Sequence, residues 1–428
     1  MEQTVATTVP LPTDRQAIQR RVVSVLALAQ VLGGVGVASG AAVGALLAAD
    51  LSSEKFSGLA AASSVVGAAL IAIPVSRLMD ERGRRPGLLL AYAFGLIGAM
   101  LVILGAVVRF FPITLLGLMA VGGGTTATLQ SRYAATDLVD KAHRGRALST
   151  VVWATTVGSV LGPNLSSPMG DLGERLGIPR LAGPYLLTGS VFVLSALLVS
   201  VFLRPDPLLV ARELRGETAH HAASRPKRSM REALNAIFAV RAATLGFLAV
   251  VAGHAVMVAV MSMTPVHLHD GGGSLEVIGI VISLHIAGMY AASPLVGMAA
   301  DRYGRIPVIV TGCLILLAAF VFAGTASGHE APQLAAGLTL LGLGWSCTMI
   351  AGSTLLTDSI PADLHPNVQG TTDVLMGFAG ASAGLLSGVV VGFGSYALLN
   401  IATTLVIVPL LVAALRAYRA RATVVARI

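Results

Sequence analysis

Charged residues are scarce in this chain of 428 residues. Only 12% of the residues are Asp, Glu, Lys or Arg, about half of the ~25% found in soluble domains. Hydrophobic residues make up 55%. This composition excludes a soluble globular protein, and its high hydrophobicity also excludes a disordered chain, which would need the opposite balance.

Cysteine and aromatic residues are also rare. The two cysteines, Cys313 and Cys347, both lie in apolar runs and provide neither a disulfide framework nor the spacing of a metal site. Aromatic residues make up 5% of the chain, whereas there are 48 glycines. Small residues let helix backbones approach closely within a bilayer. The composition therefore favours packed transmembrane helices over the strands of a membrane barrel.

Long apolar runs dominate the rest of the sequence. A helix needs about 20 apolar residues to cross the hydrocarbon core, and twelve runs meet this need, which predicts an all-α membrane protein embedded in a lipid bilayer. The first run is too long for a signal-peptide core, so we expect it to be retained. The runs are Val22–Ala49, Gly58–Met79, Gly87–Val108, Ile113–Ala134, Ala147–Met169, Tyr185–Leu203, Ala242–Val266, Leu275–Ala299, Pro307–Ala326, Gln333–Leu356, Thr372–Phe393 and Tyr396–Leu415.

The positions of Lys and Arg predict the orientation. If the N-terminus is inside, the inner segments hold 24 of the 29 basic residues and the outer loops hold 4, with Arg132 near the inner end of the fourth run. Inner loops are richer in Lys and Arg, so we expect a protein of the cytoplasmic (inner) membrane with both termini in the cytoplasm. The net charge of +8 then reports topology, and no nucleic-acid partner is expected.

Two motifs recur at the same offset. Asp80 and Asp301 end the second and eighth runs and are 221 residues apart, as are Asp137 and Asp358 at the ends of the fourth and tenth runs. This repeat predicts an N-terminal six-helix bundle over residues 1–203, a cytoplasmic linker over 204–241 and a C-terminal six-helix bundle over 242–428. Paired halves of this kind bind their substrate near the bilayer midplane, between the halves.

The repeated motif resembles the G-x-L-A-D-R-x-G-R-K signature of the major facilitator superfamily. Residues Gly297–Arg305 read G-M-A-A-D-R-Y-G-R, whereas the first copy has Ser76 and Glu81 in place of Gly and Arg. The resemblance implies a twelve-helix transporter that works by alternating access, and we expect it to be a monomer. In the family, charge pairs of the signature hold the cytoplasmic face shut while the outer face is open. The gating residues implied here are Asp80, Gly83, Arg84, Asp301, Arg302, Gly304 and Arg305.

Acidic residues are missing from the interiors of the predicted spans. Asp373 comes nearest, as a first-turn acid that complements the helix dipole of the run starting at Thr372. Without a buried carboxylate, export of organic cations is disfavoured, and the usual proton site is missing. Neutral or nearly neutral groups remain inside the membrane, and we assign Gln30, Asn164 and His254 to the substrate cavity.

Methionine and histidine gather on two helix faces. His254, Met257 and Met261 follow one face of the seventh run, and His285 and Met289 follow one face of the eighth. At 1.5 Å per residue, Met257 lies roughly 13 Å and His285 roughly 15 Å below the outer helix ends, so both groups reach the middle of the membrane. Thioether and imidazole are ligands that Cu(I) prefers.

The spacing of these residues resembles that of the CcoA-type copper importers of the same superfamily. In that family an MxxxM pair on helix 7 and an HxxxM pair on helix 8 are needed for copper uptake. The resemblance implies that Met257, Met261, His285 and Met289 bind copper, as a transported substrate and not as a cofactor; no resident cofactor is expected. Copper import is the first functional hypothesis.

A small organic solute is the alternative substrate, moved with proton coupling. Residues Gly158–Asn164 resemble the G-x-x-x-G-P element of facilitator antiporters, although Ser166 and Ser167 stand where that element has glycines. A vitamin, a drug or another metabolite would fit this hypothesis. No catalytic motif occurs in its required context, so no enzyme activity is expected.

Overall fold

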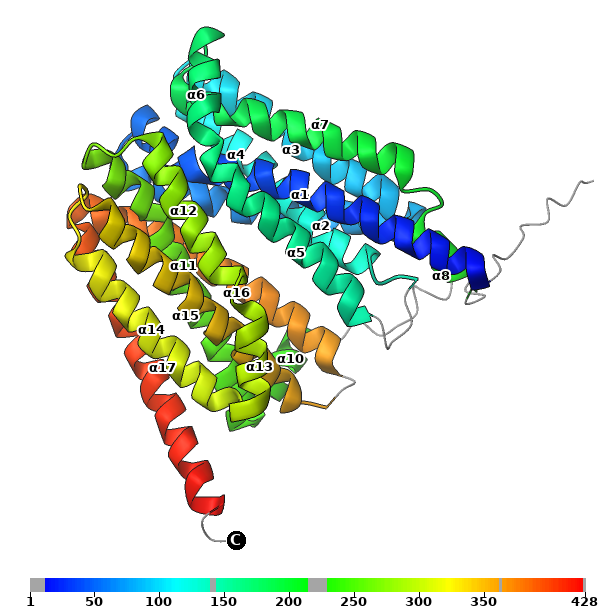
Figure 1. The fold of residues 1–428 in the computed structure, drawn as a ribbon, viewed down its shortest axis with the longest axis vertical. Coiled ribbons are helices and arrows are strands. Elements are labelled where there is room, and N and C mark those ends of the chain that lie inside the picture. Colours follow the sequence, from blue (N-terminus) through cyan, green and yellow to red (C-terminus); the bar gives the residue numbers. More distant parts are fainter. Residues whose placement is uncertain (1–11, 139–143, 215–228, 362–363, 426–428) are drawn as a thin grey trace, which may run out of the picture.

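The computed structural model describes residues 12–138, 144–214, 229–361 and 364–425. Within these ranges the chain forms helices and no strands (Figure 1). The N-terminal half contains α1 (Pro12–Leu51), η1 (Glu54–Phe56), α2 (Gly58–Arg82), α3 (Arg84–Val107), α4 (Phe111–Ala134), α5 (Arg144–Asn164), α6 (Ser166–Arg175), η3 (Arg180–Ala182), α7 (Pro184–Phe202) and α8 (Pro207–Leu214). The C-terminal half contains α10 (Met230–Ala239), α11 (Arg241–Asp270), α12 (Leu275–Tyr290), α13 (Ser293–Tyr303), α14 (Arg305–Thr325), α15 (Ala331–Asp358), α16 (His365–Phe393) and α17 (Tyr396–Val425).

The long helices pack as two bundles with corresponding arrangements. In the first bundle α4 packs against α2 and α3, and α7 packs against α1 and α3; in the second, α15 packs against α12 and α14, and α17 packs against α11 and α14. α12 and α13 form one span, interrupted by a turn at Ala291 and Ala292. The 221-residue repeat is therefore reflected in the packing of the helices.

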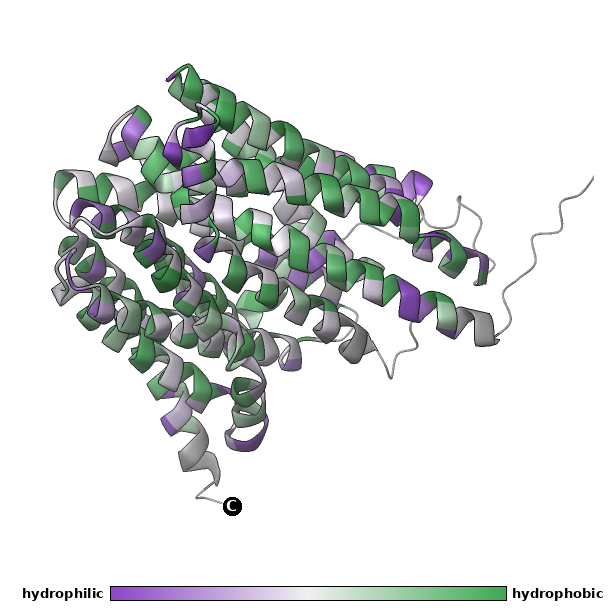
Figure 2. Cartoon of the chain, turned by 45° about the horizontal axis from the view of Figure 1, so that its top comes forward, coloured by the Kyte–Doolittle hydropathy of each residue, from purple (hydrophilic) through white to green (hydrophobic). Residues whose placement is uncertain are grey.

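Eleven helical segments of the described ranges are long and apolar enough to cross a membrane. The twelfth, α5, is less hydrophobic than these, and it packs along α1 in the first bundle. Hydrophilic residues gather at the helix ends, and the helix bodies are mainly hydrophobic (Figure 2). The predicted fold class, twelve helices in two six-helix bundles, is confirmed.

The two bundles meet mainly at one end. We call the end that carries Asp137 and Asp358 the signature end and the other, near α6 and the start of α12, the opposite end. α5 packs against α12, and α2 packs against α16, close to the opposite end. The bundles diverge toward the ends that carry α8 and α10 (Figure 1).

Candidate functional site

An ion pair anchors the signature turn in each bundle. Arg84 at the start of α3 binds Asp137 through Nε–Oδ2 (2.8 Å) and Nη2–Oδ1 (3.1 Å). Arg305 at the start of α14 binds Asp358 through Nε–Oδ2 at 3.0 Å, and Asp301 lies 3.3 Å from the same guanidinium. Each pair joins two helices of one bundle. A role of these residues in gating stays a prediction.

The glycines of the signature occupy the backbone conformation that the motif demands. Gly83 and Gly304 lie between consecutive helices with φ of 96° and 95°, a region that side chains with a Cβ rarely adopt. Arg302 is exposed, with its guanidinium 5.4 Å from the ring of Tyr303. The carboxylate of Asp80 is exposed, and its backbone carbonyl accepts a hydrogen bond from Arg212 Nη1 at 2.7 Å.

Asp206, which the sequence analysis missed, completes the first signature. Its carboxylate accepts hydrogen bonds from the backbone N–H groups of Arg84 (3.1 Å), Arg85 (2.8 Å) and Leu208 (3.0 Å). One anion therefore satisfies the free N–H groups at the starts of α3 and α8. An acidic residue directly before Pro207 was a detectable helix-start pattern, but the contact with α3 depends on the fold.

Asn164 lies where the two bundles meet, toward the opposite end. Its Nδ2 donates to Ser283 Oγ of α12 at 2.7 Å, and Ser283 Oγ donates to the carbonyl of Val160 at 2.7 Å. Beside this contact, Gly279 packs directly on the carbonyl of Pro163. Asn164, predicted to line the substrate cavity, thus joins α5 to α12.

Gln30 and His254 lie in different surroundings. Gln30 is fully buried and donates through Nε2 to the carbonyl of Thr128 at 2.8 Å, inside the first bundle. His254 is partly exposed, and its Nδ1 accepts a hydrogen bond from Trp345 Nε1 at 3.2 Å. Tyr290 meets Trp345 edge-on, with ring centroids 5.8 Å apart. Of the two, His254 belongs to a cluster of aromatic rings shared by α11, α12 and α15.

Asp373 lies deeper than the sequence predicted. Its helix begins at His365 and not near Thr372, so Asp373 is eight residues into α16, about 12 Å along its axis. The expectation of a first-turn acid is therefore wrong. Pro366 near the start of α16 was a pattern that could have placed this boundary correctly.

Arg132 brings a cation from the other bundle to this carboxylate. The guanidinium of Arg132, on α4, interacts electrostatically with Asp373 of α16 and with Tyr290 of α12. Asp373 is exposed and Arg132 is partly buried. Each bundle thus places one ionisable group within a predicted span, and ionisable groups in such positions are functional candidates by default.

The four candidate copper ligands lie in the second bundle. Met257 and Met289 belong to its buried core, and Met261 packs against that core. His285 is fully buried and its Nδ1 makes a 2.8 Å hydrogen bond with the carbonyl of Leu338 on α15. α15 packs closely along both α11 and α12, which touch each other only sparsely. A copper site formed by these four residues stays a prediction.

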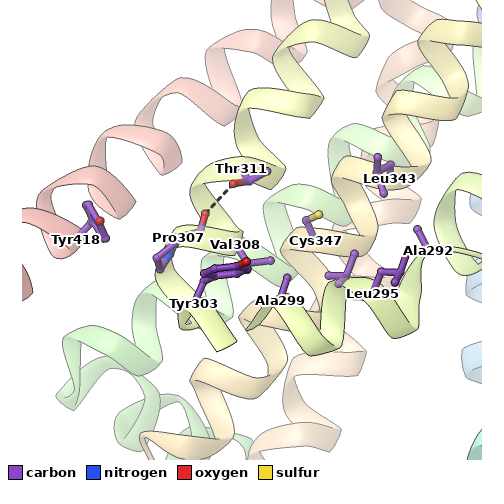
Figure 3. A pocket seen from close by; sticks show the side chains of 11 residues that line it. Ala292, Leu295, Ala299, Tyr303, Pro307, Val308, Thr311, Leu343, Cys347 and Tyr418 are labelled. Carbon is purple, nitrogen blue, oxygen red and sulfur yellow. Dashed lines mark hydrogen bonds between the residues drawn. The ribbon is translucent and has the colours of Figure 1, made fainter. Parts of the chain in front are cut away.

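An apolar pocket of about 670 Å³ lies elsewhere, between α13, α14, α15 and α17. Leu295, Val308 and Leu343 are among its lining residues (Figure 3). The hydroxyl of Thr311 donates to the carbonyl of Pro307 on its own helix at 3.1 Å. None of the predicted metal or substrate residues lines this pocket, which lacks the charges that a polar solute would need.

The sequence profile of the Major Facilitator Superfamily matches residues 25–273 and 245–427. The chain belongs to the major facilitator superfamily. It is 34% identical over 405 residues to the uncharacterised MFS-type transporter YddS of Bacillus subtilis (strain 168), covering 94% of this chain and 92% of YddS.

Two further proteins of the comparison are more distant in sequence. It is 26% identical over 379 residues to the riboflavin transporter RfnT of Brucella anthropi, covering 88% of this chain and 90% of RfnT. A bacterial homologue of the human lysosomal transporter Spinster, in an inward-facing and unoccupied conformation, has the same fold, with a TM-score of 0.68 at 15% identity over 93% of this chain and 95% of that one. The facilitator is a multi-pass membrane protein and a secondary transporter.

Proposed function

We propose that this facilitator transports a small polar organic solute that binds between its two bundles. The observation that carries the proposal is that spans of the two different bundles contain opposite charges: Arg132 of α4, whose buried Nε has no hydrogen-bond partner among the described residues, and Asp373 of α16. A solute that contacts both charges would be held by both bundles and would move with them as they rock, which is how alternating access operates. The similarity to a riboflavin transporter supports an organic substrate.

The distribution of Lys and Arg along the chain indicates which side of the membrane the bundles open toward. If the signature end faces the cytoplasm, as the Lys and Arg positions predict, the bundles are closed toward the outside and diverge toward the inside. The carboxylate of Asp373 would then supply the protonatable group that a proton-coupled transporter needs.

Copper import is the second candidate, favoured by one specific observation. Nε2 of His285 is buried and has no hydrogen-bond partner among the described residues. Imidazole nitrogen and the thioethers of Met257, Met261 and Met289 form a ligand set suited to Cu(I). A copper path through this set would require α11 and α12 to bring these side chains together beside α15.

Uptake by cells carrying Met261→Leu separates the two candidates. Leu matches Met in volume, so the packing should change by less than about 1.5 kcal/mol while the sulfur is lost. The proposed function predicts unchanged riboflavin accumulation in this variant and no copper accumulation that depends on the transporter. Radiolabelled riboflavin and radiocopper are measured in cells with and without the gene. Copper uptake by the wild type that Met261→Leu and His285→Gln both abolish would overturn the organic-solute proposal.

A further inference from the structure

We infer that the facing surfaces of the two bundles form a recognition site for a planar aromatic solute whose edge carries a carbonyl group beside an N–H group. His254, Tyr290 and Trp345 of the second bundle supply the aromatic wall. Arg132 and Asp373 supply the charged groups that form hydrogen bonds with the edge of the solute. This inference rests on the proposed function and narrows its substrate class.

The aromatic wall is built from three rings on three helices. The centroid of Trp345 lies 6.3 Å from that of His254 and 5.8 Å from that of Tyr290, with the Tyr290 ring nearly perpendicular to the indole at 76°. Trp345 is 7% exposed, and the two flanking rings are partly exposed. Tyr290 packs edge-on against the indole and His254 is tilted to it by 51°, so contact with Trp345 orients both outer rings.

The hydrogen bond inside the wall determines what His254 can offer. The indole of Trp345 can only donate, so Nδ1 of His254 must accept and its proton sits on Nε2. Nε2 has no hydrogen-bond partner in the described part of the chain. A Cβ at Gly380 of α16 would come within 2.9 Å of this nitrogen, so the glycine keeps space for the ring. His254 thus presents an N–H donor from a fixed position.

Arg132 and His254 contribute hydrogen-bond donors to the proposed site, and Asp373 contributes an acceptor. The guanidinium of Arg132 can donate five N–H bonds, and its buried Nε has no partner among the described residues. His254 adds one donor, and the carboxylate of Asp373 adds an acceptor. Carbonyl oxygens of a ligand would satisfy Arg132 and His254, and a ligand N–H would satisfy Asp373. A planar ring with an imide or amide edge carries this pattern, whereas a metal ion or a sugar lacks the flat acceptor edge.

The chain offers a spectroscopic reporter for this site. It contains two tryptophans: Trp345 and Trp153, which is 63% exposed on α5. In a Trp153→Phe background the purified transporter therefore reports only on Trp345. We expect riboflavin and uracil, as planar probes, to change the emission of Trp345 in a saturable manner, and D-xylose, as a non-planar control, to have no effect.

Three variants in this background test the individual contacts. Arg132→Gln and Asp373→Asn should each weaken binding of the planar probes at least tenfold, and His254→Phe, which keeps a flat ring but loses the donor, should weaken binding severalfold. Arg109→Gln is the matched control, because Arg109 is exposed near the opposite end and pairs with Asp50 at 3.5 Å; its binding should equal that of the parent.

Two results would overturn the inference: no binding of either planar probe, or equal binding by the parent and by the Arg132 and Asp373 variants. Riboflavin accumulation in cells that is lost with Arg132→Gln and Asp373→Asn but unchanged with His254→Phe would leave the proposed function in place while removing the aromatic wall from the site. Accumulation of copper alone would remove both.

Discussion

The side chains of Arg84 and Asp137 are 16% and 12% exposed, whereas those of Arg305 and Asp358 are 28% and 52% exposed. These two ion pairs occupy equivalent positions in the two halves. Removing one partner of a buried pair leaves an uncompensated charge, which costs about 3–5 kcal/mol, whereas exposed pairs contribute about 0–1 kcal/mol. The equivalent pairs should therefore differ in their effect on stability.

At the residue scale we predict that Asp137→Asn destabilises the protein by about 3 kcal/mol, because Arg84 loses a bidentate partner in a mostly buried site. Asp358→Asn should cost less than about 1 kcal/mol, since solvent screens Arg305 and Asp301 remains nearby. The thermal unfolding midpoints of both variants, purified in detergent, give the comparison. Equal shifts would show that the difference in burial does not control these pairs.

At the scale of elements, the contact between α2 and α16 depends on glycine. A Cβ on Gly58 would collide with the carbonyl of Gly384, and a Cβ on Gly388 would come within 2.9 Å of the Gly58 nitrogen. Lys55, in the preceding η1, lies over the ring of Phe393 at 4.0 Å. Close approach of the two backbones therefore closes the opposite end, as small residues allow in membrane helices.

Gly58→Ala should force α2 away from α16, because a clash with the backbone cannot be relieved by a rotamer change. The rate of riboflavin uptake should fall at least tenfold. Gly377→Ala is the matched control on α16, since its Cβ would meet only Val65 at 3.9 Å, and it should transport normally. Uptake into proteoliposomes is compared at equal protein content. Normal transport by Gly58→Ala would mean that the bundles need not approach this closely.

At the scale of the whole molecule, orientation in the membrane stays a prediction from charge. A reporter fused within residues 204–241 should read cytoplasmic, and one fused within Asp171–Pro184, beside α6 and η3, should read external, because inner segments hold 24 of the 29 basic residues. Enzymatic reporters active on only one side of the membrane make the measurement. The reverse pair of readings would invert the transporter and the proposed direction of opening.

Several features of this facilitator followed from the sequence by itself. The twelve apolar runs, the 221-residue repeat and the glycines at 83 and 304 are local patterns, because a span needs only length and hydrophobicity and a tight turn needs only a residue without a Cβ. The resemblance carried by these patterns led to the correct superfamily. Copper as the substrate gained no support from the relatives. The spacing of four side chains along two helices does not determine the distances between them across the helices.

Only the tertiary structure decided which side chains meet. Asp206 reaches two helix starts, Asn164 bridges the bundles, and Gln30 turns into its own bundle. Asp373 moved two turns into its helix when the start shifted to His365, and only the packing of the bundles brought Arg132 toward it. The physical reason is rotation: each residue turns about 100° around a helix axis, so the neighbour of a polar group depends on helix phase and packing, which hydrophobic runs do not encode.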